Sequence, residues 1–225
     1  MIPVSLYQGK DKMTKTKEWA DALGINTQDI LPPSEDNNVN YVRTAEEVAA
    51  RTVILHSIVA AGSGIDRSSI SQWLKDKNLW DHASPHEQTA LLSPMVFRED
   101  RSEVQWFQES QWALLWTIQK VKILGLPIKT CDSIRLVDDI MPVLGGDTDQ
   151  FISTSEFRAA AEINAEIDRI KRIYYYARQA ADRGEMPEDL IYGVIYHRCY
   201  AFRWLTSDGS WDDVSIDEDE LDFQG

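Results

Sequence analysis

The sequence lacks the residues and patterns that mark disulfide-rich and membrane proteins. Two cysteines, Cys131 and Cys199, are too few for a disulfide framework in 225 residues. No stretch reaches the ~18 consecutive apolar residues that a membrane span needs. Residues 1–17 contain no apolar core of a secretory signal. We therefore expect a protein of a reducing, cytoplasmic compartment that has no membrane partner.

Catalytic and cofactor-binding motifs are also missing. Gly62-Ser63-Gly64 is not followed by Gly-Lys-Ser/Thr, so it is no phosphate loop, and the chain has no Gly-x-Ser-x-Gly elbow. His82 and His86 have the spacing of zinc ligands, but Pro85 begins a helix between them. We expect no metal and no cofactor. Enzymatic activity stays uncertain, and the absence of a visible nucleophile weighs against it.

Basic residues stop at Arg203, whereas residues 206–225 carry eight acids, and the whole chain has a net charge of −14. Such a field repels phosphate backbones and attracts cations. Because no basic stripe is present, the sequence argues against nucleic acid as a partner and is compatible with a basic protein partner. The simpler alternative is that these charges are solvated and only keep the protein in solution.

Apolar residues recur every three or four positions, and no alternating strand pattern is longer than four residues. The pattern predicts an all-α, irregular bundle of about seven helices with a polar N-terminal linker and an acidic C-terminal tail. We divide the chain into an appendage and linker (1–40), one α-helical domain (41–216) and the tail (217–225). The expected helices cover residues 15–23, 44–62, 69–77, 100–122, 133–140, 153–183 and 187–206, with a further helix that begins at residue 84.

Helix starts are the clearest local signals. Thr44-x-x-Glu47 and Ser84-Pro85-x-Glu87 have the spacing of capping boxes, and Ser153-x-x-Glu156 has it too. Pro187 is expected at the first turn of the last helix, where proline is tolerated.

Glu109 is the first candidate for a functional group, because helical spacing places it beside Trp106 and Trp112. A carboxylate among indoles has a raised pKa unless a base pairs with it. As a functional group, Glu109 would serve as a general acid or as an anchor that binds an arginine. We favour a structural ion pair, because buried charges are normally paired. The candidate partners are Arg51, Arg158 and Arg198.

Arg198 lies on an apolar helical stripe, where an arginine is expected to pair with an acid or to lay its stem on aromatic rings. Asp168 and Arg169 border the apolar face of the preceding helix. Glu109, Asp168, Arg169 and Arg198 therefore form a candidate polar network, either catalytic or structural.

Eight tryptophans are unusually many for a chain of this length. Large aromatics dominate both cores and interfaces, so those on the predicted helices belong to one or the other. We expect Trp211 to dock back onto the bundle. The candidate aromatic surface or core consists of Trp112, Trp116, Trp204 and Trp211.

Several motifs follow one another in a fairly specific order between about Arg43 and Asp217. They are the Arg51 helix leading to Trp73-Leu74 and Leu79-Trp80, Ser84-Pro85-x-Glu87, Glu109-x-x-Trp112-Ala113-Leu114-Leu115-Trp116, Pro127 with Cys131-Asp132, and Arg198-x-x-Ala201-x-x-Trp204-Leu205 followed by Trp211-Asp212-Asp213-Val214. This order resembles the mainly bacterial family of domains of unknown function numbered 4272. The resemblance implies a soluble α-helical protein and brings no reaction, cofactor or substrate. Residues 1–40 are expected to lie outside it.

Two functions are compatible with these observations. The favoured one is a non-enzymatic interaction module that binds a basic protein partner, for example an immunity-type inhibitor of a cationic toxin. The alternative is a small-molecule binding protein or enzyme with a polar site built from Glu109, Asp168 and Arg198. The oligomeric state is not indicated by any pattern in the sequence.

Overall fold

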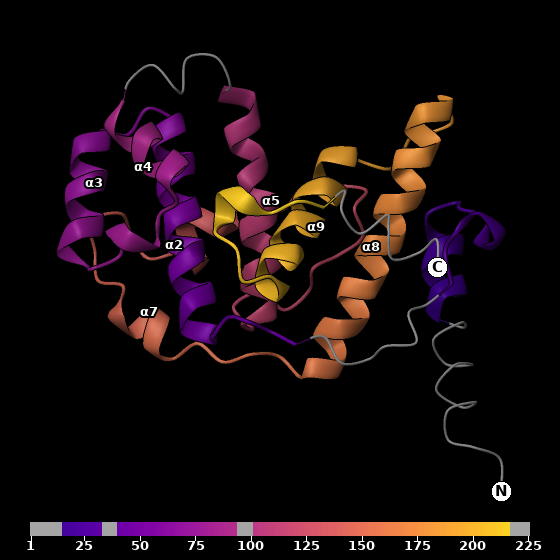
Figure 1. Ribbon diagram of the computed structural model, residues 1–225, viewed down its shortest axis with the longest axis horizontal. Helices are drawn as coiled ribbons and strands as arrows, with labels where there is room; N and C mark the ends of the chain where they lie inside the picture. Colours follow the sequence, from indigo (N-terminus) through magenta and orange to yellow (C-terminus); the bar gives the residue numbers. More distant parts are fainter. Residues whose placement is uncertain (1–14, 33–39, 94–100, 217–225) are drawn as a thin grey trace, which may run out of the picture.

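The computed structural model describes residues 15–32, 40–93 and 101–216, which form an all-α, multi-helix fold with no strand in these ranges (Figure 1). The acidic tail predicted at residues 217–225 lies outside the described residues. A first helix covers residues 15–22. The later elements are η1 (Thr27–Asp29), α2 (Ala45–Gly62), α3 (Arg67–Asp76), η2 (Trp80–His82), α4 (Pro85–Leu92), α5 (Arg101–Thr117), α6 (Ser133–Arg135), the π-helical turn η3 (Leu136–Ile140), α7 (Asp149–Ser153), α8 (Ala160–Arg183), α9 (Tyr192–Thr206) and η4 (Trp211–Asp213).

Helices α2, α5 and α9 form the centre of the fold, with α5 packed between the other two. Helix α8 covers α9 on one side, and α3 and α4 lie beyond α2 on the other (Figure 1). Nearly every residue of α2 is buried, which is why it shows no strong polar face. Helix α5 is buried continuously from Glu109 to its end at Thr117, in agreement with its predicted central place.

Both capping boxes predicted for α2 and α4 are present. Thr44 Oγ1 accepts from the Glu47 amide at 3.2 Å, and the Thr44 amide donates to Glu47 Oε2 at 2.7 Å. Ser84 and Glu87 exchange the same two bonds at 3.3 and 2.8 Å. Each pair satisfies two amides that would otherwise lack acceptors at the helix start.

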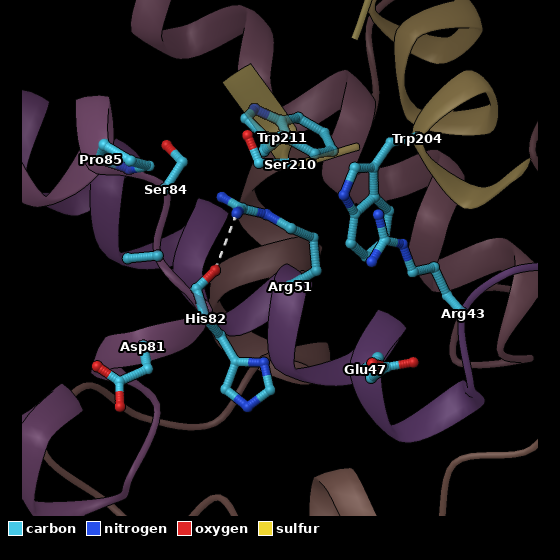
Figure 2. Close-up of a pocket in the computed structure, with 11 residues that line it drawn as sticks. Arg43, Glu47, Arg51, Asp81, His82, Ser84, Pro85, Trp204, Ser210 and Trp211 are labelled. Atoms are coloured by element: carbon cyan, nitrogen blue, oxygen red, sulfur yellow. Dashed lines mark hydrogen bonds between the residues drawn. The ribbon is translucent and has the colours of Figure 1, made fainter. Parts of the chain in front are cut away.

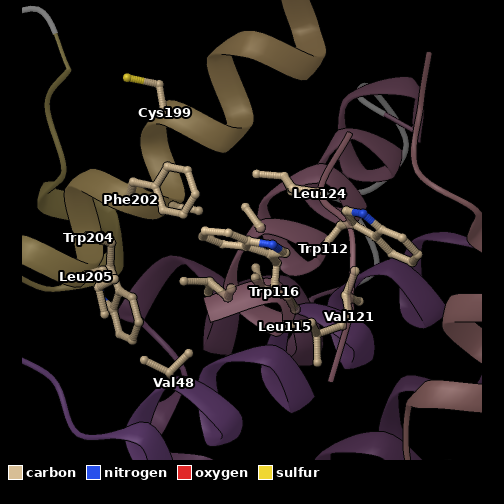
Figure 3. Close-up of a cluster of buried hydrophobic side chains, with 14 of the residues drawn as sticks. Val48, Trp112, Leu115, Trp116, Val121, Leu124, Cys199, Phe202, Trp204 and Leu205 are labelled. Carbon is tan, nitrogen blue, oxygen red and sulfur yellow. The ribbon is translucent and has the colours of Figure 1, made fainter. Parts of the chain in front are cut away.

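The core between α5 and α9 is built from large aromatic and aliphatic side chains (Figure 3). Trp116 meets Phe202 edge-on, with ring centroids 6.3 Å apart. Trp112 is buried on the same helix, 6 % exposed. Burial of aromatics of this size contributes several kcal/mol in total, at about 25 cal/mol per Å² of apolar surface.

The long helix predicted from residue 153 begins later, at Ala160, so that prediction was wrong in its start. Residues 155–159 instead run along the end of α5, which stops at Thr117 rather than near Lys122. The Arg158 amide donates to Thr117 O at 2.8 Å, and its guanidinium donates to Trp116 O and Val121 O at 3.2 and 3.0 Å. Carbonyls at the end of α5 are thus satisfied by a residue about 40 positions further along, and this tertiary contact overrides the local start signal.

The last helix also begins later than predicted, at Tyr192 instead of Pro187. The Leu190 amide donates to Pro187 O, which closes a turn, and the Ile191 amide donates to Pro127 O at 3.0 Å. Residues 187–191 are therefore tied to the loop after α5 and do not continue α9. The predicted helix at 133–140 is present, as α6 followed by η3.

Residues 15–31 pack on α8. Trp19 is 8 % exposed and lies under the Arg172 guanidinium, 5.4 Å from its ring centroid. The same guanidinium donates to Leu31 O and to Thr16 Oγ1, both at 2.7 Å. The division of the chain at residue 40 stays a prediction.

Candidate functional site

Glu109 on α5 and Arg198 on α9 form an ion pair in the interior, and both side chains are 2 % exposed. Arg198 Nε and Nη2 donate to Glu109 Oε2 at 3.1 and 3.0 Å, and Nη1 donates to Gly125 O at 2.9 Å. The other carboxylate oxygen accepts from the Cys131 amide. The pair is neutral, hydrogen-bonded on all sides and closed to solvent, as a structural ion pair requires.

Cys131, which is half-buried, lies beside this ion pair. Burial raises the pKa of its thiol, and the nearby Glu109 carboxylate raises it further. The thiolate is the reactive form of cysteine, so this thiol is held in its unreactive form.

The other two members of the predicted polar network lie on α8 and do not meet Glu109. Asp168 Oδ2 accepts from Arg172 Nη1 at 3.4 Å, on the side of α8 that carries residues 15–31. Arg169 donates to Glu166 at 2.5 Å. Burial raises the pKa of the Glu166 carboxyl, and the charges of Arg169 and Arg198 oppose that shift. Arg169 thus pairs with Glu166, on which the charge of Arg198 also acts, while Asp168 belongs to a separate contact.

The four tryptophans separate into two pairs. Trp112 and Trp116 belong to the core described above. Trp204 and Trp211 lie near the end of α9, with ring centroids 5.7 Å apart and exposures of 6 and 5 %. All four are therefore interior residues, and the second pair also borders a pocket.

Residues 207–216 fold back over the bundle, and we call them the C-terminal clasp. Trp211 is its anchor: its ring centroid lies 5.0 Å from that of Tyr200 and 4.6 Å from the Arg51 guanidinium. The Tyr200 hydroxyl donates to Trp211 O. The docking of Trp211 expected from the sequence is thus present.

Asp212 fixes the clasp to the start of α4. Its carboxylate accepts from Ser84 Oγ at 2.6 Å and from the His86 amide at 2.9 Å. A carboxylate at a helix start is favourable, because it faces the unpaired amides and the positive end of the helix dipole. Asp212 therefore acts as a cap supplied from a distant part of the chain.

A pocket of about 270 Å³ lies between α2, η2, the start of α4 and the clasp (Figure 2). Its walls carry two arginines that each lie on an indole: Arg43 is 4.9 Å from the Trp204 ring centroid, and Arg51 lies on Trp211. Arg51 Nη1 donates to His82 O at 3.3 Å, and Nη2 pairs with the buried Glu87 carboxylate. Glu47, Asp81 and Ser210 also line the pocket.

Sequence reasoning did not find this pocket, since its lining residues are far apart in the chain. One signal was available: Arg51 interrupts the apolar face of α2, and an arginine in that position needs a buried partner. That partner, Glu87, is the same residue that completes the capping box of α4.

The part of the chain that the structure describes was also searched for metal-binding clusters and for membrane-spanning helices. No group of three or more His, Cys, Asp or Glu side chains there is arranged to hold a metal ion. Among the same residues, no helix combines the length and the apolar character needed to cross a membrane.

Comparison with protein families gives one match, to the domain of unknown function DUF4272, over residues 12–214. The chain belongs to this family. The match begins well before Arg43, so the expectation that residues 1–40 lie outside the family was wrong for residues 12–40. Searches of curated proteins and of solved structures found no match.

The motifs that indicated the resemblance to DUF4272 lie at two places in the structure. Glu109, Cys131 and Arg198 meet at the buried ion pair. The Arg51, Ser84-Pro85-x-Glu87 and Trp211-Asp212 motifs meet at the clasp and its pocket. The motifs thus describe two packing centres, and one of them opens to solvent.

Proposed function

We propose that the protein is a non-enzymatic interaction module that binds a basic protein partner. The observation that carries this proposal is the net charge of −14. An inhibitor of the immunity type, acting on a cationic toxin, is one concrete form of such a module.

The arrangement of charges supports this proposal. Arg51 and Arg198 are buried and each is neutralised by one carboxylate, Glu87 and Glu109 respectively. Pairs of this kind bury equal charges of both signs, so their burial leaves the net negative charge of the rest of the chain undiminished. A field of one sign attracts an oppositely charged partner over distances of roughly the Debye length, about 8 Å at physiological salt.

The alternative of an enzyme or small-molecule binder at Glu109, Asp168 and Arg198 has less support. A substrate would have to reach an ion pair that is 2 % exposed on both sides. Asp168 lies on another face of α8 and pairs with Arg172. The contacts of the three side chains therefore support two separate packing sites better than one common reaction site.

The test is affinity capture of the partner from cells of the native host. The affinity of the purified complex is then measured at several salt concentrations. We expect a partner with a basic isoelectric point and an affinity that falls about tenfold or more between low and physiological salt, because screening weakens the attraction. A chain lacking residues 217–225 loses five carboxylates and should bind more weakly. An acidic partner, or an affinity independent of salt, would contradict the proposal.

A further inference from the structure

The pocket beside the clasp carries opposite charges on opposite walls, with Arg43 on one side and Asp81 on the other (Figure 2). We propose that this pocket binds a small zwitterion of the amino-acid type. The carboxylate of the ligand would bind Arg43, and an ammonium group at the far end of its side chain would bind Asp81 on the opposite wall. This site is independent of the basic partner proposed above.

Arg43 is a fixed cation with unused donors. Its guanidinium lies on the Trp204 ring, which restricts its motion, and its Nη2 donates to Ser207 O at 3.1 Å and to Gly209 O. In the described residues no group accepts from Nη1, and the side chain is half-buried. A guanidinium held in this way is prepared to bind a carboxylate, since little rotamer freedom remains to be lost.

The opposite wall offers acceptors. Asp81 at the centre of η2 is exposed, and among the described residues its carboxylate has no hydrogen-bond or ion-pair partner. Glu47 uses one oxygen to bind the Thr44 amide and also lines the pocket. An ammonium group has three donors and is attracted to carboxylates placed in this way.

The balance of charge narrows the class of ligand. Arg51 is neutralised by Glu87, so the pocket is left with one unpaired cation, Arg43, against the carboxylates of Glu47 and Asp81. Together with the overall charge of −14, this excess favours a ligand with a net charge of zero or +1 over one with −1. Lysine or ornithine should therefore bind more tightly than glutamate.

The dimensions suit a single amino acid. The volume of about 270 Å³ lies just below the ~300 Å³ at which most ligand pockets begin. Trp204 and Trp211 supply apolar wall for the methylene groups of a side chain. Because Ser210 and Trp211 form part of the wall, a bound ligand would also hold the clasp in place.

To test this, L-lysine, L-leucine and L-glutamate are each titrated into the full-length protein, and the indole resonances of the tryptophans are followed by NMR. The single-charge probes acetate and n-butylammonium are titrated in parallel. We expect saturable shifts of the Trp204 and Trp211 signals with lysine, weaker binding of leucine and glutamate, and binding at least about tenfold weaker for either single-charge probe.

Two variants separate binding from folding. Asp81→Asn removes an exposed carboxylate without a partner, so the fold should be retained and lysine binding should weaken about tenfold, as for one lost charge contact. Glu188→Gln makes the same change of charge on an exposed residue before α9 and serves as control. The proposal is overturned if no amino acid gives a saturable shift, if acetate or butylammonium binds as tightly as lysine, or if Asp81→Asn and Glu188→Gln bind lysine alike.

Discussion

Arg198 on α9 binds Glu109 on α5 through two N–H donors, and neither side chain is more than 2 % exposed. This contact joins two of the three central helices. Because the remaining oxygen of Glu109 binds the Cys131 amide, the same carboxylate also fixes the loop between α5 and α6.

Loss of one partner of this pair should be costly. Arg198→Met leaves the Glu109 carboxylate buried without its cation, and we expect a loss of about 3–5 kcal/mol in the free energy of unfolding. The double variant Arg198→Met/Glu109→Leu leaves no unpaired charge and should be more stable than Arg198→Met alone. Urea denaturation measures both.

A surface pair serves as the control. Glu162→Gln breaks the ion pair with Arg158, in which the Glu162 side chain is 57 % exposed, and should cost no more than about 1 kcal/mol. An Arg198→Met variant as stable as this control would mean that the interior tolerates the unpaired carboxylate.

The clasp depends on Asp212. Asp212→Ala removes the acceptor of the Ser84 hydroxyl and of the His86 amide, and should lower the free energy of unfolding by about 1–2 kcal/mol. Asp208→Ala changes an exposed acid of the same segment and should stay within about 0.5 kcal/mol of the native protein. If both variants lost the same free energy of unfolding, the hydrogen bonds of Asp212 to Ser84 and His86 would contribute nothing beyond its negative charge.

Lowering the pH should reduce the free energy of unfolding, because His197 is buried in its neutral form. Its ring stacks on Trp106 at 6.3 Å, and burial lowers its pKa from 6.5 to about 4. At pH values between these two pKa values, His197 binds a proton in the unfolded chain but stays neutral in the folded protein. The contribution of His197 is therefore fully present above about pH 6.5 and is lost by up to about 1.4 kcal/mol per pH unit as pH decreases toward 4, and His56, whose pKa burial also lowers to about 4, adds a similar loss.

The contribution of His197 can be isolated with His197→Phe, which keeps an aromatic ring against Trp106. The free energy of unfolding of this variant should depend less on pH between about 4 and 6.5 than that of the native protein. Parallel pH profiles for the two proteins would exclude a buried neutral histidine at this position.

Cys131 should react slowly. In a Cys199→Ser background, modification by a disulfide reagent at about pH 8 should be at least about a hundredfold slower in the folded protein than in urea, because the half-buried Cys131 thiol is kept protonated beside the Glu109 carboxylate. Similar rates in the two conditions would contradict the closed environment around Glu109.

Local sequence signals identified the helices that begin with their own caps. Thr44 with Glu47 and Ser84 with Glu87 are such starts, and the structure has both boxes. The Ser153-x-x-Glu156 signal failed because the Arg158 amide and guanidinium bind the end of α5, which fixes residues 155–159 in a different conformation.

The candidate site was predictable only in part. A buried partner for Glu109 follows from the cost of an unpaired interior charge, and Arg198 was among the candidates. The pocket was not predictable, because Arg43, Asp81 and Trp211 come together only after the clasp has docked. Spacing along the chain carries no information on such long-range contacts.

The end of α5 has a consequence for fragments of this protein. The carbonyls of Trp116, Thr117 and Val121 find their donors in Arg158, and the Arg158 guanidinium also lies 4.8 Å from the Trp116 ring centroid. A proteolytic fragment that stops before residue 158 loses these donors together with α8 and α9, including Arg198, the partner of Glu109. We therefore expect such a fragment to unfold as a whole and not to keep α5 as a stable part of the core.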